Sequence, residues 1–289
     1  MNAPADHDLV DVPAGILLRG TGEAALDEIA AAQHYPRRWF EDESPSQPLP
    51  VAAFRIDRHP VTNAQYRRFA DATGYRTLSE QRGRSLVYGS EFWEETAGAH
   101  WRRPTGPDGP PALDDHPTVH LTLGDATAYA TWAGLRLPTE TEWEYAARGP
   151  DSTRTWPWGN TWNPDAASTA DTTSTPLHDE HAWRAWWNSQ RVAHALPATT
   201  PIGGRPHGAS PFYVHDLAGN VQEWTSTVYH PYDPTRDYGT VYSHIVGRYV
   251  VLRGGSWMHY RWQTRCAERI AADPGYTNFA TGFRCATER

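Results

Sequence analysis

Three short segments carry apolar residues at the spacing of an α-helix, and two of them begin with a capping box. The first box, Thr62–Gln65, precedes an apolar helical face that stops at Gly74. The second box, Thr139–Glu142, opens a predicted helix over Trp143–Arg148. Asp125–Ala133 has the same period and is predicted to be a third helix, ended by a glycine.

Strand signals are short and widely spaced. The Pro-rich stretch from Arg103 to Pro117 is predicted to be a loop, and Asp165–Ser210, which shows little periodicity, is expected to be a long surface excursion. No repeat or composition change divides the chain, so we expect one domain over residues 10–289 after a tail of residues 1–9. The predicted strands are Gly15–Arg19, Ala52–Asp57, Thr118–Thr122 and Tyr249–Arg253.

Composition indicates a globular chain with little regular structure. The 289 residues are 39% hydrophobic and 21% charged, and they include 23 glycines, 24 prolines and 14 tryptophans. In such a loop-rich chain, indole and phenol rings are expected to fill spaces that helices usually fill. No apolar run approaches the roughly 20 residues that a membrane-spanning helix needs, so no membrane association is expected.

All 26 basic residues are arginines. The absence of lysine excludes a Schiff-base lysine, a phosphate-binding loop that ends in Gly-Lys, and a kinase-type catalytic lysine. The formal net charge is −8 and the arginines are scattered, so nucleic acid is not expected as a partner.

Met1–Val12 lacks the basic start and apolar stretch of a signal peptide, and the chain has two cysteines, Cys266 and Cys285. This pattern is typical of a cytoplasmic protein with reduced thiols. A single disulfide between the two cysteines is the alternative.

Two patterns favour ordinary structure over chemistry. Gly20–Ala25 imitates a dinucleotide-binding fingerprint, but no alternation of strand and helix follows it, and a turn is the better interpretation. The 14 histidines include no HExxH or HxH motif, and Pro117 lies between His116 and His120, which argues against one metal-binding helical face.

The segment Asp216–Trp224 is a candidate cation loop. It carries carboxylates near both ends, with a glycine turn and backbone carbonyls between them, and calcium prefers six to eight oxygen ligands of this kind. A loop closed by side-chain hydrogen bonds is the alternative, and spacing alone does not decide between them.

Several segments together resemble the formylglycine-generating (sulfatase-modifying factor) family. They run in the family's order from about Val10 to the C-terminus. The segments are His59–Tyr66, Trp101–Asp108, His116–His120, Ala133–Gly149, Pro157–Asn160, Asp216–Trp224, Arg253–Trp257 and Gly282–Ala286.

The resemblance implies a single-domain α+β fold, the C-type-lectin-like fold of formylglycine-generating enzymes, with little regular secondary structure and structural calcium. It assigns one calcium to the side chains of Asp216 and Glu223 and to the carbonyls of Gly219 and Val221.

The chain departs from the family at the active site. Active members carry two cysteines, at the third and eighth positions after the serine of Arg-Gly-Gly-Ser, and these thiolates bind Cu(I). Here those positions are His259 and Thr264. We therefore expect no sulfatase activation by the copper–thiolate route.

The two cysteines that remain resemble structural cysteines of the family. The disulfide partners that the family implies for Cys266 and Cys285 fall at Ala147 and Ala130, respectively. The resemblance therefore leaves both thiols unpaired.

Two functions remain open. The first is a metal-dependent, O2-using oxidoreductase acting on a small molecule or peptide in specialised metabolism, with Cu or Fe bound by His259 and, next, His215. Trp257, Tyr260 and Arg261 are the other candidate catalytic residues of this hypothesis.

The second is a non-catalytic lectin-like binding or accessory protein with structural calcium. In that case Trp257–Trp262 would form an aromatic wall, and Arg253, Arg261 and Arg265 could pair a ligand carboxylate. A core role for the tryptophans explains most of them equally well.

Overall fold

Short strands and helices surround an aromatic core in the computed structural model, which describes residues 7–33, 36–150, 153–172, 180–192 and 199–289. Its α-helices are α1 (Glu23–Gln33), α2 (Asn63–Thr73), α3 (Leu78–Arg82), α4 (Leu123–Trp132), α5 (Glu140–Arg148), α6 (Glu180–Val192) and α7 (Thr240–Ile245). Its strands are β1 (Leu9–Val12), β2 (Gly15–Arg19), β3 (Gln47–Val51), β4 (Phe54–Asp57), β5 (Arg84–Tyr88), β6 (Trp93–Ala97), β7 (Gln222–Val228), β8 (Val250–Arg253), β9 (Ile270–Ala272), β10 (Thr281–Phe283) and β11 (Ala286–Glu288). The predicted α+β class is confirmed.

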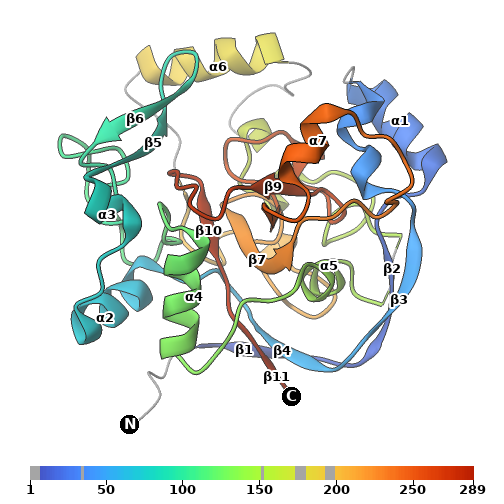
Figure 1. Ribbon diagram of the computed structural model, residues 1–289, viewed down its shortest axis with the longest axis horizontal. Coiled ribbons are helices and arrows are strands. Elements are labelled where there is room, and N and C mark those ends of the chain that lie inside the picture. Colours follow the sequence, from blue (N-terminus) through green and yellow to red (C-terminus); the bar gives the residue numbers. More distant parts are fainter. Residues whose placement is uncertain (1–6, 34–35, 151–152, 173–179, 193–198) are drawn as a thin grey trace.

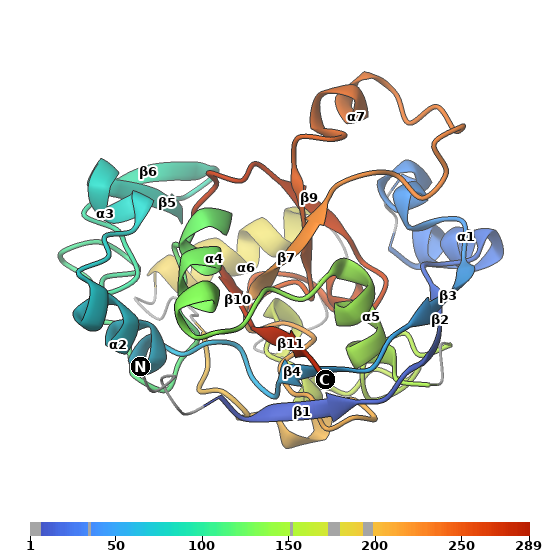
Figure 2. The same cartoon turned by 60° about the horizontal axis from the view of Figure 1, so that its bottom comes forward.

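In the described residues, β2-β3 and β5-β6 form two-stranded sheets, and two larger sheets organise the chain. One of the larger sheets has the order β1-β4-β11. In it β1 and β11, from the two ends of the chain, each pair antiparallel with β4. Figure 2 shows these three strands together along one side of the molecule. The other has the order β10-β7-β8-β9, with β10 parallel to β7 and the remaining pairs antiparallel. Figure 1 shows this second sheet near the centre, with α4 and α5 beside it and α6 across the top.

The three predicted helices are confirmed, and all three have capping boxes. Thr62 and Thr139 each accept a hydrogen bond from the backbone of the third residue after them, as the sequence indicated. The middle helix starts earlier than predicted, because Thr122 and Asp125 form a third box that places Leu123 in the first turn. Gly74, with φ 69°, ends α2 in the left-handed conformation that favours glycine.

Three of the four predicted strands are present, and the fourth prediction is wrong. β2 has the predicted bounds, while β4 and β8 are slightly shorter than expected. Thr118–Thr122 is not a strand. His120 adopts φ 62°, which interrupts an extended run, and its imidazole is held between Ser85 Oγ (2.7 Å) and the Pro104 carbonyl (2.8 Å).

The expectation of an unpatterned surface excursion is wrong for residues 180–192, which form α6. Trp183, Trp186 and Trp187 are spaced i, i+3, i+4 and pack into one buried cluster with Trp257 and Phe279. Residues 173–179 and 193–198 of the same stretch lie outside the described residues.

The N-terminal boundary predicted at residue 10 falls inside β1, which begins at Leu9. His7 already contacts the domain through Asp57 (2.7 Å), and Asp8 pairs with Arg58. Residues 1–6 of the predicted tail lie outside the described residues.

Buried arginine–glutamate pairs tie distant segments together. Because the chain has no lysine, its buried cations are guanidinium groups, which bind a carboxylate through two parallel hydrogen bonds. Arg265 meets Glu43 at 2.6 and 2.8 Å, across 222 residues of chain. Arg284–Glu223 and Arg269–Glu140 are bound in the same way, while Arg253 is bound to Glu144 through one nitrogen.

Candidate functional site

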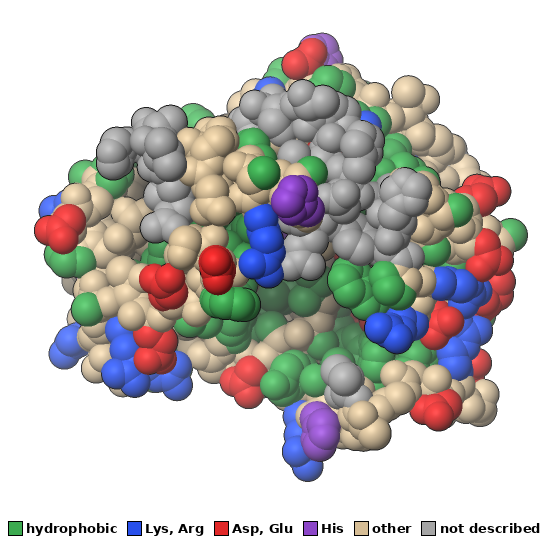
Figure 3. Space-filling view, turned by 90° about the horizontal axis from the view of Figure 1, so that it is seen from above, with side chains coloured by type: hydrophobic (Ala, Val, Ile, Leu, Met, Phe, Trp, Pro, Cys, Tyr) green, Lys and Arg blue, Asp and Glu red, His purple; other side chains and the backbone are tan. Residues whose placement is uncertain are grey.

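A cavity of about 580 Å³ opens above the four-stranded sheet. Leu252 of β8 and the whole of β9 form part of its wall. Figure 3 shows a hollow with hydrophobic sides on this face of the molecule. The volume is in the usual range for a small-molecule site. The aromatic residues that line the cavity are Trp39, Tyr88, Trp93, Trp183, Tyr249, Tyr260 and Tyr276.

Helix α6 positions one side of the cavity through its indoles. The Trp183 N–H donates to the Met258 carbonyl (2.7 Å), and the Trp187 N–H donates to the Gly89 carbonyl (2.6 Å). Trp187 also stacks on Trp257, with ring centroids 5.9 Å apart. These contacts fix α6 to the loop after β8 and to the turn between β5 and β6, so that Trp183 reaches the cavity.

The loop after β8 brings His259 to the cavity wall. The Ser256 backbone N–H donates to His259 Nδ1 (3.0 Å), and Ser256 Oγ lies 2.8 Å from the same nitrogen. Burial lowers the pKa of His259 to about 4, so the ring is neutral near pH 7. A neutral imidazole that accepts a hydrogen bond at Nδ1 carries its proton on Nε2. His259 therefore offers the cavity a hydrogen-bond donor.

This arrangement does not fit His259 as a redox-metal ligand. A coordinating imidazole nitrogen needs a free lone pair, but Nδ1 is occupied by Ser256 and Nε2 carries the proton. Thr264, at the other position where active relatives have cysteine, is buried and donates its hydroxyl to the Arg261 carbonyl (2.8 Å). It does not appear among the described residues that line the cavity.

The other candidate catalytic residues occupy different environments. Tyr260 lines the cavity beside His259. Trp257 is buried at 3% exposure and packs beneath the wall. Arg261 faces elsewhere, since its Nε lies 3.1 Å from Asp171 and its guanidinium lies 5.1 Å from the Trp162 ring centroid.

The expectation that Arg253, Arg261 and Arg265 could bind a ligand carboxylate is wrong. Arg253 is fully buried and pairs with Glu144, and Arg265 is held by Glu43. Arg261 is engaged by Asp171, as described above. All three guanidinium groups already have internal carboxylate partners.

The side chains of the predicted calcium loop are bonded within the protein. Both Glu223 oxygens accept from Arg284 (2.6 and 2.7 Å), and one also accepts from the Trp143 indole (2.8 Å). Asp216 accepts from the Gly203 N–H (2.8 Å) and lies 3.3 Å from His59 Nδ1. These contacts do not fit an ion held by both carboxylates.

The backbone of the same loop is built around a glycine. Gly219 has φ 84°, and its N–H donates to the Gly254 carbonyl (2.8 Å), while Val221 is fully buried next to the start of β7. The calcium site stays a prediction, and no step below is derived through it.

His215 does not line the cavity and is not brought together with His259 there. Its ring centroid lies 5.1 Å from that of His59, beside Asp216. Burial and the neighbouring His59 lower the pKa of His215. A redox site that joins His215 to His259 therefore has no support in this arrangement.

Both cysteines are free and buried, so the disulfide alternative is wrong. Cys266 shares one hydrophobic cluster with Ala147, and Cys285 shares another with Ala130. These are the two pairs that the family resemblance implied, with alanine at the partner position. Burial raises the pKa of Cys266 to about 12 and raises the pKa of Cys285 well above its ordinary value, so neither is a thiolate near pH 7.

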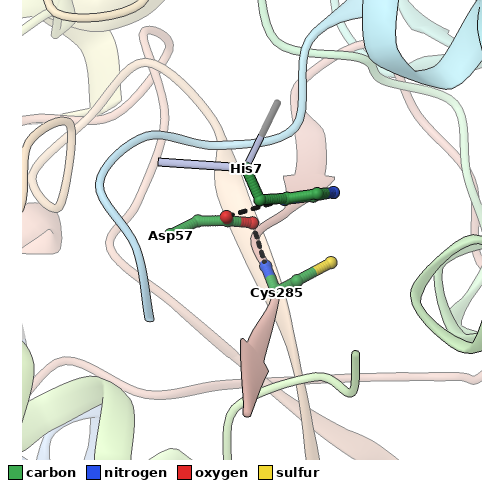
Figure 4. A group of neighbouring side chains, drawn as sticks. All are labelled: His7, Asp57 and Cys285. Atoms are coloured by element: carbon green, nitrogen blue, oxygen red, sulfur yellow. Dashed lines mark hydrogen bonds and ion pairs between the residues drawn. The ribbon is translucent and has the colours of Figure 1, made fainter. Parts of the chain in front are cut away.

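Sequence reasoning did not anticipate the group of His7, Asp57 and Cys285, drawn in Figure 4, which the fold joins across more than 200 residues. His7 Nδ1 meets Asp57 (2.7 Å), and Nε2 meets the Tyr129 hydroxyl (3.1 Å). The Cys285 N–H donates to the same aspartate (2.8 Å). Because both imidazole nitrogens are bonded, the group fits a structural tie between the chain ends better than a metal site.

Sequence reasoning missed several cavity residues, among them Tyr88, Trp93, Trp183 and Asp273. Only Trp183 had a usable signal, its i, i+3, i+4 spacing with the next two tryptophans. The others come from β6, the end of β5 and the turn after β9, which become neighbours only in the folded chain.

Comparisons with known proteins agree on the type of domain. The family model described as "Sulfatase-modifying factor enzyme 1-like domain" matches residues 2–289. Formylglycine-generating enzyme of Bos taurus is 31% identical over 97% of this chain and 74% of its own length. The enzyme of that name from Streptomyces coelicolor is 35% identical, over 92% of this chain and 87% of its own length. "Inactive C-alpha-formylglycine-generating enzyme 2" of Mus musculus is 29% identical, over 86% of this chain and 79% of its own length.

Two solved structures share the fold. PvdO from Pseudomonas aeruginosa has a TM-score of 0.64 at 22% identity and covers 97% of this chain and 94% of its own. CarF has a TM-score of 0.52 at 18% identity and covers 98% of this chain and 99% of its own. At these identities the likeness concerns the fold alone. The predicted single-domain fold class is thereby confirmed.

Proposed function

The chain belongs to the sulfatase-modifying factor family, and from this premise we propose that it binds an aromatic small molecule or peptide side chain in the cavity beside His259, without the copper–thiolate reaction. The observation that carries the proposal is the lining of that cavity. Aromatic rings and a neutral imidazole face it, and none of the described lining residues is a cysteine.

The aromatic lining supports recognition of a flat apolar group. Ring pairs contribute about 0.5–1.5 kcal/mol beyond the burial of their area, and seven rings lie around one cavity. The His259 Nε2–H, Gln222, Gln263 and Asn278 add a few polar groups that can orient a ligand. A mostly apolar cavity with a few directed polar groups is the usual form of a small-molecule site.

The position of the thiols supports the second half of the proposal. Cu(I) binding needs soft thiolate ligands, and both thiols of this chain are buried in other clusters as neutral groups. His259 and Thr264, which occupy the positions of the active-site cysteines, are each engaged in hydrogen bonds within their own loop.

The proposal is tested by calorimetric titration of the full chain with 2-phenylethanol, phenethylamine and phenylacetate, three probes that share one ring. We expect at least one to bind at one site per chain, and Trp93→Ala to weaken that binding. Phe92→Ala is the matched control, because Phe92 is 66% exposed and is not a lining residue of the cavity. If none of the probes bound, or if both variants bound equally well, the proposal would be wrong.

A parallel assay tests the copper–thiolate reaction, which we propose that this chain does not carry out. The copper-loaded chain and the Streptomyces coelicolor enzyme are incubated with a cysteine-containing sulfatase peptide and O2. We expect the aldehyde product only with the Streptomyces enzyme. Aldehyde formation by this chain would contradict the proposal.

A second candidate function is a metal-dependent, O2-using oxidoreductase that acts on the same ligand. The likeness to enzymes named formylglycine-generating enzyme favours it, at 31–35% identity over most of the chain. Elemental analysis after loading with Cu or Fe, together with O2 uptake in the presence of a bound ligand, tests it. One equivalent of redox metal and ligand-dependent O2 uptake would support it, whereas calcium alone or no metal would exclude it.

A further inference from the structure

The charge of the cavity wall is one-sided. Among the described lining residues, Asp273 is the only carboxylate, and none is an arginine, although the chain has 26. Burial keeps His259 neutral near pH 7, so it does not offset the aspartate. Three arginines between β8 and β9 or at the end of β8, Arg253, Arg261 and Arg265, are already paired with internal carboxylates.

Three of the rings form a corner. Tyr88 is nearly perpendicular to Trp93 (84°, centroids 5.4 Å apart) and to Trp183 (86°, 5.0 Å). Perpendicular rings present faces and edges in more than one direction around a single point. A cation is attracted to the negative face of such rings, by about 0.5–2 kcal/mol depending on how far it is desolvated.

A second cavity of about 700 Å³ adjoins the first. The two share Trp39, Gln263, Ile270 and Ala271. The two carboxyl groups of the second cavity are engaged within the protein, since Asp42 accepts from the Tyr229 hydroxyl (2.7 Å) and Glu268 accepts from Arg265 (2.8 Å).

The basic groups of the second cavity are Arg269 and Arg38. Arg269 is bound to Glu140 (2.6 and 2.9 Å), so its charge is largely compensated. Arg38 is exposed to solvent, which weakens its field in the cavity. An anionic ligand would therefore meet no uncompensated buried cation among the described residues of either cavity.

We propose that the ligand of this cavity carries a positively charged amine or ammonium group, which lies against the Tyr88–Trp93–Trp183 corner and is attracted by Asp273. The proposal rests on the proposed function and specifies its ligand class. A neutral part of the same ligand accepts a hydrogen bond from His259 Nε2. The ligand thus combines a cation, an apolar or aromatic body and a hydrogen-bond acceptor.

The test compares the three probes of the same ring and different charge. Phenethylamine is a cation, 2-phenylethanol is neutral and phenylacetate is an anion near pH 7. We expect the affinities to fall in that order, with phenethylamine about two- to thirtyfold tighter than 2-phenylethanol, the range that corresponds to the cation–π energies above. Added salt should weaken phenethylamine binding and leave that of 2-phenylethanol nearly unchanged.

Asp273→Asn tests the carboxylate. We expect it to weaken phenethylamine about two- to fivefold and to leave 2-phenylethanol unchanged, as for a partly exposed ion pair. Asp237→Asn is a matched control outside the cavity. Each aspartate is exposed and accepts from the N–H two residues later at 2.8 Å, a bond that asparagine can also make.

Each result decides between the two proposals. If the three probes bind equally, or if phenylacetate binds best, the cation is wrong and the aromatic site remains. If Asp237→Asn weakens phenethylamine as much as Asp273→Asn does, the role of Asp273 is wrong. If no probe binds, the proposed function itself fails.

Discussion

The backbone N–H of Ser256 donates to Nδ1 of His259 at 3.0 Å, and this bond decides what the histidine can do. It places the imidazole proton on Nε2, so the ring faces the cavity as a hydrogen-bond donor rather than as a metal ligand. A histidine at the position of an active-site cysteine can therefore support binding without inheriting the copper chemistry.

The first prediction concerns this tautomer. In ¹⁵N NMR spectra of the full chain near pH 7, His259 should appear as the neutral Nε2–H form, because Nδ1 accepts from Ser256. One equivalent of Zn²⁺ should leave its ring signals in place. A neutral Nδ1–H tautomer, or ring signals that shift on addition of zinc, would show that His259 is free to bind metal.

The second prediction concerns acid stability. Burial lowers the pKa of folded His259 from 6.5 to about 4, so between those values the unfolded chain binds a proton that the folded chain resists. The free energy of unfolding should therefore fall as the pH drops from about 6.5 to about 4. In His259→Asn, whose Oδ1 can also accept from Ser256, this part of the pH dependence should be absent.

The comparison is made from urea unfolding curves of both proteins at several pH values. His120, another buried histidine with a lowered pKa of about 3, is present in both and cancels in the difference. A difference between the two proteins that stays constant across this pH range would refute the role assigned to His259.

The third prediction concerns the thiols. Because Cys266 and Cys285 are buried and protonated, a thiol reagent should modify neither in the native state and both after unfolding in denaturant. Rapid modification of either thiol in the native chain would contradict their placement in the core. Cys266→Ala, which repeats the substitution already present at Ala147, should fold and keep its probe affinity.

The fourth prediction separates an ion pair from a calcium site. Arg284→Ala leaves Glu223 as a buried unpaired carboxylate and should lower the free energy of unfolding by about 3–5 kcal/mol. The loss should be the same with added calcium and with a chelator. A chelator that destabilises the unmodified chain by a similar amount would show instead that Glu223 helps to hold a metal ion.

The sequence predicted local features well where their hydrogen bonds close within a few residues. The capping boxes at Thr62 and Thr139 each join a side chain to a backbone N–H three residues away. The spacing of the residues in the sequence is therefore enough to predict these hydrogen bonds. β2 was also predicted, although it pairs with the more distant β3, because its apolar run is bounded by a proline and a glycine. The strand expected at Thr118–Thr122 failed because its conformation follows from the distant contacts of His120 with Ser85 and Pro104.

The sequence alone indicated only some residues of the candidate site. His259 and Tyr260 were singled out because they follow Arg-Gly-Gly-Ser, and both line the cavity. The arginines beside them were misassigned, because a guanidinium in the sequence does not reveal which carboxylate it meets. Arg265, for example, is paired with Glu43 through a contact that spans 222 residues.

By itself the sequence determined the family, the capping boxes of two helices and the loss of the cysteine pair. Each of these depends on residues that are close together in the sequence or on the identity of single residues. Only the tertiary structure decided the tautomer of His259, the carboxylate partner of each buried arginine and the aromatic corner of the cavity. The physical reason is that these features depend on which distant groups folding brings within hydrogen-bonding or van der Waals distance. The spacing of neighbouring residues in the sequence does not specify those partners.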